Sequence, residues 1–265
     1  LTNVTQRKSK IMIIDGKQLS AKLKQEMAAQ VVSLKEQYGR VPSLVVILVG
    51  ENPASQSYVR GKIKACAECG FDSRLVTMPE SVSEAELLAE IERLNAEQDV
   101  DGILVQLPLP KHIDEEKVID AIALEKDVDG FHPLNVANLW LGKPCILPCT
   151  PKGVMRMIEE CGFNVAGSNA VVVGRSNIVG KPMAKLLLDA NATVTIAHSR
   201  TKNLAEVTRS ADILIAAVGR ARMITADMVS PGAIVIDVGV NRDQTTGKLC
   251  GDVDFECVKD IAAHI

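Results

Sequence analysis

A glycine-containing segment at residues 170–182 offers the clearest chemistry in the sequence, the binding of a phosphate group. It reads A-V-V-V-G-R-S-N-I-V-G-K-P. Residues 171–173 are typical of a strand buried on both faces. Gly174 permits a sharp turn, and Gly180 permits close approach of the following helix, whose N-terminus attracts anions. The segment predicts a nucleotide site, although Ser176 replaces the second glycine of G-x-G-x-x-G and an ordinary strand-to-helix turn is the alternative.

The next expected strand, at residues 192–197, is followed by groups that suit a 2′-phosphate. In dinucleotide folds, an acidic residue about 20 residues after the loop holds the ribose of NAD. Here Ser199 and Arg200 follow the strand, and Arg175 lies in the loop itself. A hydroxyl and two cations favour NADP over NAD, while a solvated surface arginine is the alternative for Arg200 alone.

A tyrosine and a lysine form a second candidate group. Tyr58 and Lys62 are four residues apart in an expected helix at 53–69, so they share one face. A surface contact is the alternative for this pair. A buried lysine, in contrast, can serve as an acid or a base.

Two further polar positions follow an expected strand at 103–105. Gln106 stands where V-Q-L-P-L-P ends that strand, at the edge where open α/β sheets bind ligands. Asp127 and Asp129 lie on the glycine loop of E-K-D-V-D-G-F. A turn or a helix cap is the alternative role for these two carboxylates.

The cysteines and histidines predict no metal site. The seven cysteines have no framework spacing, and only Cys66 and Cys69 form a C-x-x-C pair. A redox or zinc pair is conceivable there, but reduced structural thiols fit better without a second pair nearby. The four histidines show no ligand spacing either.

Strands and helices that alternate along the chain must position these residues. In the first block helices alternate with strands, and a capping box formed by Ser83 and Glu86 marks the start of the third helix. The expected elements are a helix at 18–38, a strand at 44–49, a helix at 53–69 with Gly70 as its cap, a strand at 74–78, a helix to about 96, a strand at 103–105 and a helix near 114–123.

A second block follows a proline-rich passage at 141–151. Thr150 and Pro151 are expected to cap a helix that ends at Gly162, before strands at 170–173, 193–197, 213–216 and 233–237. The alternation predicts an α/β fold with two domains, 1–148 and 149–265, joined near 145–155 and separated by a cleft.

Bulk properties indicate a soluble enzyme. The chain has 265 residues, of which 47% are hydrophobic, with 30 basic and 33 acidic residues and a net charge of −3. Only 3% are aromatic, so we expect no nucleic-acid partner. No apolar run suits a membrane, and the first ten residues lack the core of a secretory signal, so we expect a cytoplasmic protein.

Six motifs in register identify a family resemblance. They are S-x-x-Y-V-x-x-K, V-Q-L-P-L-P, K-D-V-D-G-F, P-C-T-P-K-G, V-V-V-G-R-S-x-I-V-G-x-P and P-G-A-I-V-I-D-V-G-V-N-R. From about Ile13 onward the chain closely resembles the bifunctional methylenetetrahydrofolate dehydrogenase/methenyltetrahydrofolate cyclohydrolase (FolD) family. The resemblance implies a folate-binding catalytic domain and a Rossmann-like parallel-sheet domain for NADP.

The resemblance also implies a reaction and its catalytic residues. NADP would oxidise methylenetetrahydrofolate to a methenyl cation, which water would open to formyltetrahydrofolate. Lys62 would be the central group, with Tyr58 orienting it and packing along the folate. Gln106 would hydrogen-bond near the lysine and the substrate, and Asp129 would hold the pterin ring.

Other residues would bind the cofactor if the resemblance holds. Gly174, Arg175 and Ser176 would contact its phosphates, with Ser199 at the 2′-phosphate end. Val240 would sit against the cofactor. The resemblance further implies a homodimer through the cofactor domain.

Lys62 is expected to act in the hydration step. Hydride transfer needs positioning more than acid or base help, whereas hydration of the methenyl carbon needs proton transfers. We hypothesise that the cationic substrate favours the neutral amine of Lys62, which could then help to deprotonate water.

One departure and two alternatives complete the sequence-based interpretation. In the family a P-G-G-V-G-P-M-T loop and a helix follow the point where this sequence ends. Either these residues lie outside the sequence given or the chain is truncated, and truncation would weaken binding and catalysis. Tyr58 and Lys62 also suit a short-chain dehydrogenase, but there the nucleotide loop precedes the pair. A non-catalytic nucleotide-binding module is the other alternative, and Lys62, Gln106 and Asp129 argue against it.

Overall fold

The protein consists of two compact α/β units. A computed structural model describes residues 13–265. The first ten residues, where we expect no secretory signal, lie outside this range. Gly16–Leu147 forms one unit, and residues from Pro148 to Ile265 form the other together with the described residues before Gly16. The predicted boundary differs in assigning those first residues to the earlier domain, but Ile14 N–H donates to the Ile265 carbonyl at 2.8 Å.

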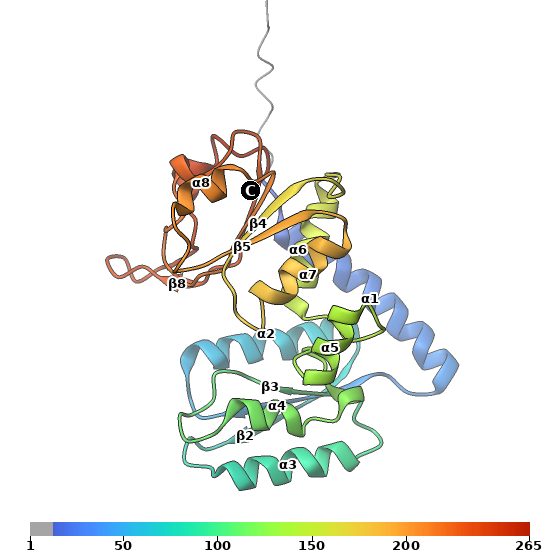
Figure 1. The fold of residues 1–265 in the computed structure, drawn as a ribbon. Helices are drawn as coiled ribbons and strands as arrows, with labels where there is room; N and C mark the ends of the chain where they lie inside the picture. Colours follow the sequence, from blue (N-terminus) through green and yellow to red (C-terminus); the bar gives the residue numbers. More distant parts are fainter. Residues whose placement is uncertain (1–12) are drawn as a thin grey trace, which may run out of the picture. The chain divides into compact units, whose positions relative to one another are not determined.

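The unit at residues 16–147 is built on a three-stranded parallel sheet of order β2-β1-β3 (Figure 1). Its elements are α1 (Gly16–Tyr38), β1 (Ser43–Val49), α2 (Pro53–Cys69), β2 (Asp72–Met78), α3 (Glu84–Ala96), β3 (Gly102–Val105), α4 (Glu115–Ala121), the short 3-10 helix η1 (Leu124–Lys126) and α5 (Pro133–Leu141). The predicted strands and the first four helices are confirmed to within two residues at most ends. Helix α5 was not predicted.

Both faces of this sheet are covered by helices because successive strand residues point to opposite sides. Val45, Ile47 and Val49 of β1 pack in a core with α3 and α4. Val46 and Leu48 pack in a separate core with α2. The near-continuous apolar strands therefore follow from burial on both faces.

Local signals fix the ends of the helices as the sequence predicts. Asn52 accepts from the first amides of α2, and Gly70 ends the helix in the left-handed conformation at φ 80°. Ser83 and Glu86 form both hydrogen bonds of the predicted capping box on α3. These helices, which carry Lys62 and frame the sheet, are thus set by residues near them in sequence.

The unit at residues 148–265 contains a four-stranded parallel sheet of order β5-β4-β6-β7. Its elements are α6 (Cys149–Glu160), β4 (Asn169–Val173), α7 (Gly180–Asp189), β5 (Thr193–Ala197), α8 (Leu204–Arg209), β6 (Ile213–Ala216), the 3-10 helix η2 (Ala226–Met228), β7 (Ile234–Asp237), the short pair β8 (Asn241–Arg242) and β9 (Leu249–Cys250), and α9 (Phe255–Val258). The four predicted strands are confirmed.

One helix start was predicted wrongly. Thr150 and Pro151 do not cap α6, which begins at Cys149 after Pro148 at φ −54° and ψ 129°, with no side-chain cap. A proline favours a position just inside a helix start, and Pro151 fits within the first turn. The misplacement arose because two prolines flank the start.

The core of this unit again has two halves. Ala170 and Val172 of β4 pack with α6 and α7, whereas Val171 and Val173 pack with the segments around η2 and α9. The strand order places β5 and β6 on opposite sides of β4, which is the switch point where open α/β sheets bind ligands.

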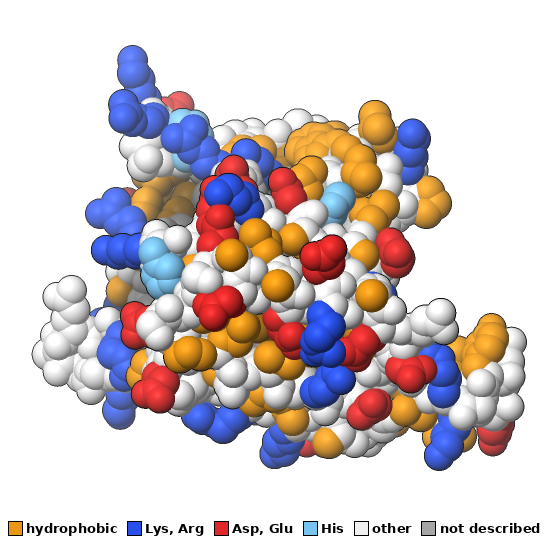
Figure 2. Space-filling view, turned by 90° about the horizontal axis from the view of Figure 1, so that it is seen from below, with side chains coloured by type: hydrophobic (Ala, Val, Ile, Leu, Met, Phe, Trp, Pro, Cys, Tyr) orange, Lys and Arg blue, Asp and Glu red, His pale blue; other side chains and the backbone are white. Residues whose placement is uncertain are grey.

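Charges are mixed on the surface. On the face seen in Figure 2, Lys and Arg side chains lie among Asp and Glu side chains over much of the surface. Among the described helices, none combines the length and apolar character needed to cross a bilayer.

Candidate active site

The glycine loop after β4 is shaped by the close approach of two backbones. Gly174 has φ 134°, which side-chain-bearing residues rarely adopt, and a Cβ there would lie 2.2 Å from the Ala217 carbonyl oxygen. A Cβ on Gly180 would lie 2.4 Å from the Gly174 carbonyl oxygen. Both predicted glycines are therefore required for β4, its loop and α7 to pack as they do.

Ser176 ties the loop to the start of α7. Its hydroxyl oxygen accepts hydrogen bonds from the Val179 and Gly180 amides, each at 3.2 Å. These are amides of the kind that a bound phosphate would otherwise accept from. The Ser176 side chain thus holds the loop against the start of α7, which a glycine at this position could not do.

A pocket of about 260 Å³ opens at the carboxyl ends of β4, β5 and β6. It is lined by Val173, Gly174, Arg175, Ser176, His198, Ser199, Ala217, Val218, Arg220 and Met223. The pocket lies at the switch point of the sheet. Arg175 and Arg220 give it positive charge, and Gly174 allows the backbone to come close to a ligand. These features fit a dinucleotide and its phosphates.

The structure separates the predicted cofactor residues into two groups. Gly174, Arg175, Ser176 and Ser199 line the pocket. Arg200 is exposed and is not among the lining residues, and Val240 is 58% exposed. Roles for these last two in cofactor binding stay predictions.

Arg220 is a pocket residue that the sequence interpretation missed. It follows β6 in the loop A-V-G-R, at the carboxyl edge of the sheet. That edge rule, applied to Gln106 in the sequence, could also have found Arg220 after the predicted strand at 213–216.

In the other unit, Lys62 and Gln106 are brought together. The Lys62 Nζ donates to Gln106 Oε1 at 3.1 Å, and Gln106 Nε2 donates to the Leu107 carbonyl at 2.7 Å. Helix α2 supplies the lysine and the end of β3 supplies the glutamine. The second bond fixes the orientation of the Gln106 side-chain amide, so that its oxygen points to Lys62.

Asp129 lies within electrostatic range of Lys62. Burial raises the pKa of the Asp129 carboxyl; the nearby Lys62 lowers it and Asp127 raises it further, and burial is the largest of these influences. A carboxyl group with this environment gains strongly from a ligand that donates hydrogen bonds to it.

Asp127 has a different role from Asp129. It is 3% exposed and accepts from the amides of Gly130 at 3.0 Å and His132 at 2.9 Å, and from Asn135 Nδ2 at 2.8 Å. It also pairs with Ile103 as an extra bridge beside β3. The turn role considered from the sequence is therefore correct for Asp127, which fastens the loop that carries Asp129.

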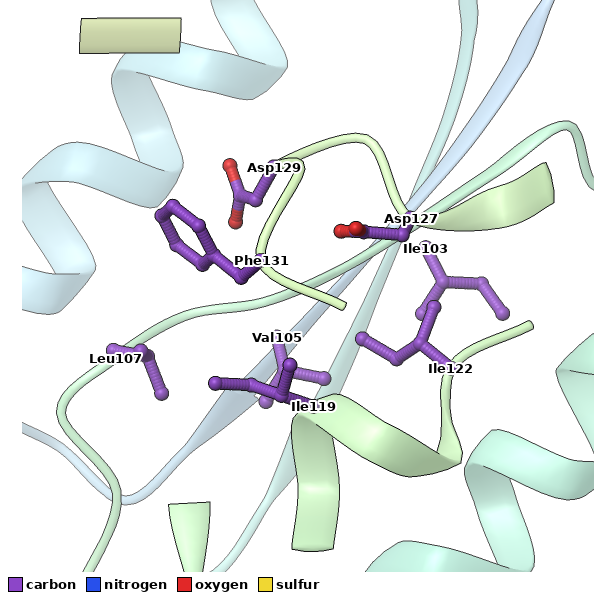
Figure 3. A pocket seen from close by; sticks show the side chains of 8 residues that line it. All are labelled: Ile103, Val105, Leu107, Ile119, Ile122, Asp127, Asp129 and Phe131. Carbon is purple, nitrogen blue, oxygen red and sulfur yellow. The ribbon is translucent and has the colours of Figure 1, made fainter. Parts of the chain in front are cut away.

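A small hollow of about 10 Å³ lies beside this loop (Figure 3). Asp129 and Phe131 lie next to each other on one side, and aliphatic side chains of β3 and α4 lie across from them. Two carboxylates, those of Asp127 and Asp129, lie in this otherwise apolar lining, and the hollow has room for about one water molecule.

Tyr58 occupies the same helix as Lys62 but is 51% exposed. Within residues 13–265, no hydrogen bond joins its hydroxyl to Lys62. In this described range, no group of three or more histidine, cysteine, aspartate or glutamate side chains is arranged to hold a metal ion.

Comparison with known proteins decides the family. Residues 14–129 match the family described as tetrahydrofolate dehydrogenase/cyclohydrolase, catalytic domain. Residues 148–265 match tetrahydrofolate dehydrogenase/cyclohydrolase, NAD(P)-binding domain. The chain belongs to this family.

Relatives of the tetrahydrofolate dehydrogenase/cyclohydrolase family match almost the whole chain. Bifunctional protein FolD of Streptococcus pneumoniae (serotype 4, strain TIGR4) is 60% identical over 253 residues, which are 96% of this chain and 88% of that protein. The crystal structure of bifunctional FolD from Campylobacter jejuni is 49% identical, with a TM-score of 0.94 over 97% of this chain and 90% of that one.

A further solved member of the family contains a cofactor. The methylenetetrahydrofolate dehydrogenase-cyclohydrolase of Trypanosoma brucei was crystallised with NADP and an inhibitor. It is 38% identical, with a TM-score of 0.92 over 96% of this chain and 89% of that chain. The family resemblance and the α/β fold inferred from the sequence are thus confirmed.

Proposed function

We propose that this protein oxidises 5,10-methylenetetrahydrofolate to 5,10-methenyltetrahydrofolate with NADP and then hydrolyses the product to 10-formyltetrahydrofolate. The observation that carries the proposal is the hydrogen-bonded Lys62–Gln106 pair within electrostatic range of the half-buried Asp129 carboxyl, in a chain that belongs to the family. A protein that only bound nucleotide would have no use for this group.

The unit at residues 148–265 binds the cofactor in this proposal. NADP, when bound, accepts the hydride from the one-carbon bridge. The glycine loop lets backbone approach the phosphates, and Ser199 and Arg175 provide a hydroxyl and a cation for the 2′-phosphate. The preference for NADP over NAD follows from these two groups, with Arg200 and Val240 as further proposed contacts.

The unit at residues 16–147 binds the folate. Asp129 accepts hydrogen bonds from the N–H groups of the pterin ring, which replace the solvation that burial removes from the carboxyl. Tyr58 packs along the folate from the exposed side of α2. Gln106 holds the Lys62 ammonium near the reacting carbon.

Lys62 serves the hydration step. Its Nζ is half-buried and held by one amide oxygen, so it can exchange protons with a water molecule at the methenyl carbon. In this proposal the Lys62 amine takes the proton of the attacking water. The oxidation step depends more on the positioning of the folate and the cofactor than on proton transfer.

The test is Lys62→Met, assayed in both half-reactions. Cyclohydrolase turnover should fall by about 100-fold or more, in line with loss of a proton-transfer group. Absorbance of the methenyl substrate reports the loss. Lys64→Met is the matched control, since Lys64 lies on the same helix with a side chain 79% exposed, and it should retain both activities. Full cyclohydrolase activity in Lys62→Met would remove Lys62 from the mechanism.

Cofactor choice is tested on the unmodified protein. Turnover of methylenetetrahydrofolate is measured with NADP and, separately, with NAD. A higher kcat/KM with NADP is expected. Cofactor binding without any folate-dependent turnover would instead support the non-catalytic nucleotide-binding module.

We also propose that two copies associate through the cofactor unit. Strand β5 lies at an edge of its sheet, and within the described residues no strand pairs with its outer side. Ile196 on that strand is 37% exposed. An edge strand with an exposed aliphatic side chain is suited to pairing with another chain.

Light scattering during gel filtration tests the homodimer. The expected mass is twice the 28.5 kDa of one chain. Ile196→Lys should shift the equilibrium toward the monomer, whereas Leu249→Lys, at an aliphatic side chain 69% exposed in β9, should not. A monomer mass for the unmodified protein at assay concentrations would contradict the proposal.

A cytoplasmic location completes the proposal. All seven cysteines fall in the described part of the chain, and none forms a disulfide. Reduced thiols are the usual state in the cytoplasm. Fractionation of cells, with detection of the protein by antibody, tests the location.

A further inference from the structure

A buried carboxylate in the cofactor unit, that of Asp252, holds the loop that follows β6. Asp252 is 0% exposed. Its carboxylate accepts from the backbone amides of Val218 at 2.6 Å, Gly219 at 3.0 Å and Arg220 at 2.7 Å. Three consecutive amides on one carboxylate fix the course of residues 218–220.

The fold makes room for this carboxylate and completes its hydrogen bonds. Asn241 Nδ2 donates to Asp252 Oδ1 at 2.8 Å. A Cβ on Gly239 would lie 2.1 Å from the Asp252 carboxyl carbon, so only glycine fits there. The buried charge is thus compensated by donors from two segments.

Another aspartate fixes the segment that carries Asp252. Asp237, at the end of β7, accepts from the amides of Asp252 and Val253, each at 2.9 Å. A Cβ on Gly251 would lie 1.8 Å from an Asp237 carboxylate oxygen. The carboxyl end of β7 is thereby linked through Asp252 to the loop after β6.

The loop that Asp252 holds is a wall of the cofactor pocket. Val218 and Arg220 line that pocket, while Asp252 does not. Any effect of Asp252 on a bound dinucleotide must therefore pass through residues 218–220. The Arg220 amide is held at its base, so its guanidinium is directed from a fixed backbone.

We propose that Asp252 is a positioning residue for the dinucleotide, which sets cofactor affinity by fixing the 218–220 loop. The proposal rests on the proposed function, since it assumes that the pocket takes NADP. It assigns Asp252 no contact with the cofactor. A preorganised loop loses less conformational freedom on binding, and a loosened one binds more weakly.

The test is Asp252→Asn in the full chain. Asparagine has the same shape, but its NH₂ group cannot accept from the amides and leaves at least one of them unpaired. The dissociation constant of NADP, measured by calorimetry, should rise by about tenfold. The KM for NADP should rise in parallel, while the KM for folate and the cyclohydrolase kcat stay unchanged.

Hydrogen exchange supplies a readout apart from activity. Peptides covering residues 217–223 should exchange faster in Asp252→Asn than in the unmodified protein, without NADP. A merely structural role would instead speed exchange throughout the unit and lower both activities in proportion. That proportional loss, or an unchanged dissociation constant, would overturn the proposal.

A second variant covers the case in which Asp252→Asn does not fold. Asn241→Ala removes one donor to the carboxylate and should raise the dissociation constant about threefold, with faster exchange at 217–223. Unchanged affinity and exchange in this variant would overturn the proposal.

Asp212→Asn is the matched control. Asp212 likewise accepts from a backbone amide, that of Asn169 at 2.8 Å, but it precedes β6 at the opposite end of the strand from the pocket and is not among the lining residues. Its NADP affinity should match the unmodified protein, and an equal loss in this control would overturn the proposal. Absence of folate turnover in the unmodified protein would count against the proposed function alone, because NADP affinity can still be compared.

Discussion

At the scale of single residues, two aspartates in one motif differ because their partners differ. Asp127 is saturated by backbone and amide donors. Asp129 stands two positions later, and burial dominates its environment. The first holds the loop and the second is available to a ligand.

The pH dependence of stability should reveal Asp129. Its folded-state pKa is raised, mainly by burial, so its contribution to stability is present at low pH and is lost as pH rises through that pKa. Asp129→Asn should therefore be more stable than the unmodified protein at pH 8. The difference should vanish below about pH 3.5, where both side chains are neutral.

Thermal unfolding between pH 3.5 and 8 measures this difference. Asp127→Asn is the control, because it replaces a carboxylate that accepts three hydrogen bonds and should destabilise the protein by about 1–3 kcal/mol at pH 8. A less stable Asp129→Asn at pH 8 would contradict the assignment.

At the scale of elements, two contacts position the candidate sites. The start of α7 packs on the loop after β4 through Gly180, and the ammonium of Lys126 closes the end of α3. Each joins a helix terminus to the loop that carries functional groups.

Gly180→Ala should weaken NADP binding. The new methyl group would lie 2.4 Å from the Gly174 carbonyl oxygen, so the phosphate loop must shift. We expect the dissociation constant to rise by about tenfold or more, measured by calorimetry. In the control Gly153→Ala in α6, a Cβ meets nothing within 4 Å, and stability should rise by about 0.5–1 kcal/mol without change in affinity. Equal affinities for the two variants would refute this account of the loop.

Lys126→Met should destabilise the folate unit. The Lys126 Nζ is buried and donates to three carbonyls at the end of α3, those of Leu94 at 3.0 Å, Asn95 at 2.8 Å and Glu97 at 2.7 Å. Loss of these three hydrogen bonds should lower the free energy of unfolding by about 2–4 kcal/mol, as measured by urea titration.

Lys117→Met serves as the matched control for Lys126→Met. Lys117 pairs with Glu84 at an exposed position, so its loss should change stability by less than about 1 kcal/mol. Similar losses in both variants would show that the ammonium at the end of α3 has no special role.

At the scale of the whole molecule, the two parallel sheets place their functional groups in the same way, although the chemistry of those groups differs. In each unit the functional groups lie at or beyond the carboxyl ends of parallel strands. We propose that the division into folate and NADP units follows this arrangement. The predicted cleft between the domains stays a prediction.

Hydrogen exchange with NADP tests the division of labour. NADP should slow exchange at residues 174–180 and 217–223 more than anywhere in residues 16–147, because the pocket belongs to the other unit. Gly180→Ala at the same NADP concentration is the control, with less protection. Protection confined to residues 16–147 would contradict the assignment.

Local chemistry let the sequence by itself determine the elements and the family. Strand β5 and helix α2 have the predicted bounds, since apolar runs and caps act on neighbouring residues. Helix α5 escaped prediction although Pro133 and Gly142 mark its ends, because its N-cap is His132, whose Nδ1 accepts from the Leu134 amide in place of a usual capping oxygen. The six motifs were enough to indicate the reaction.

Only the tertiary structure decided which polar residues act together. Lys62 and Gln106 meet because parallel strands bring the end of β3 beside α2, a contact between segments 44 residues apart. Likewise, nothing near Asp252 in sequence indicates that it holds residues 218–220. Local propensities act over a few residues, whereas the partners of a buried carboxylate depend on how distant segments pack.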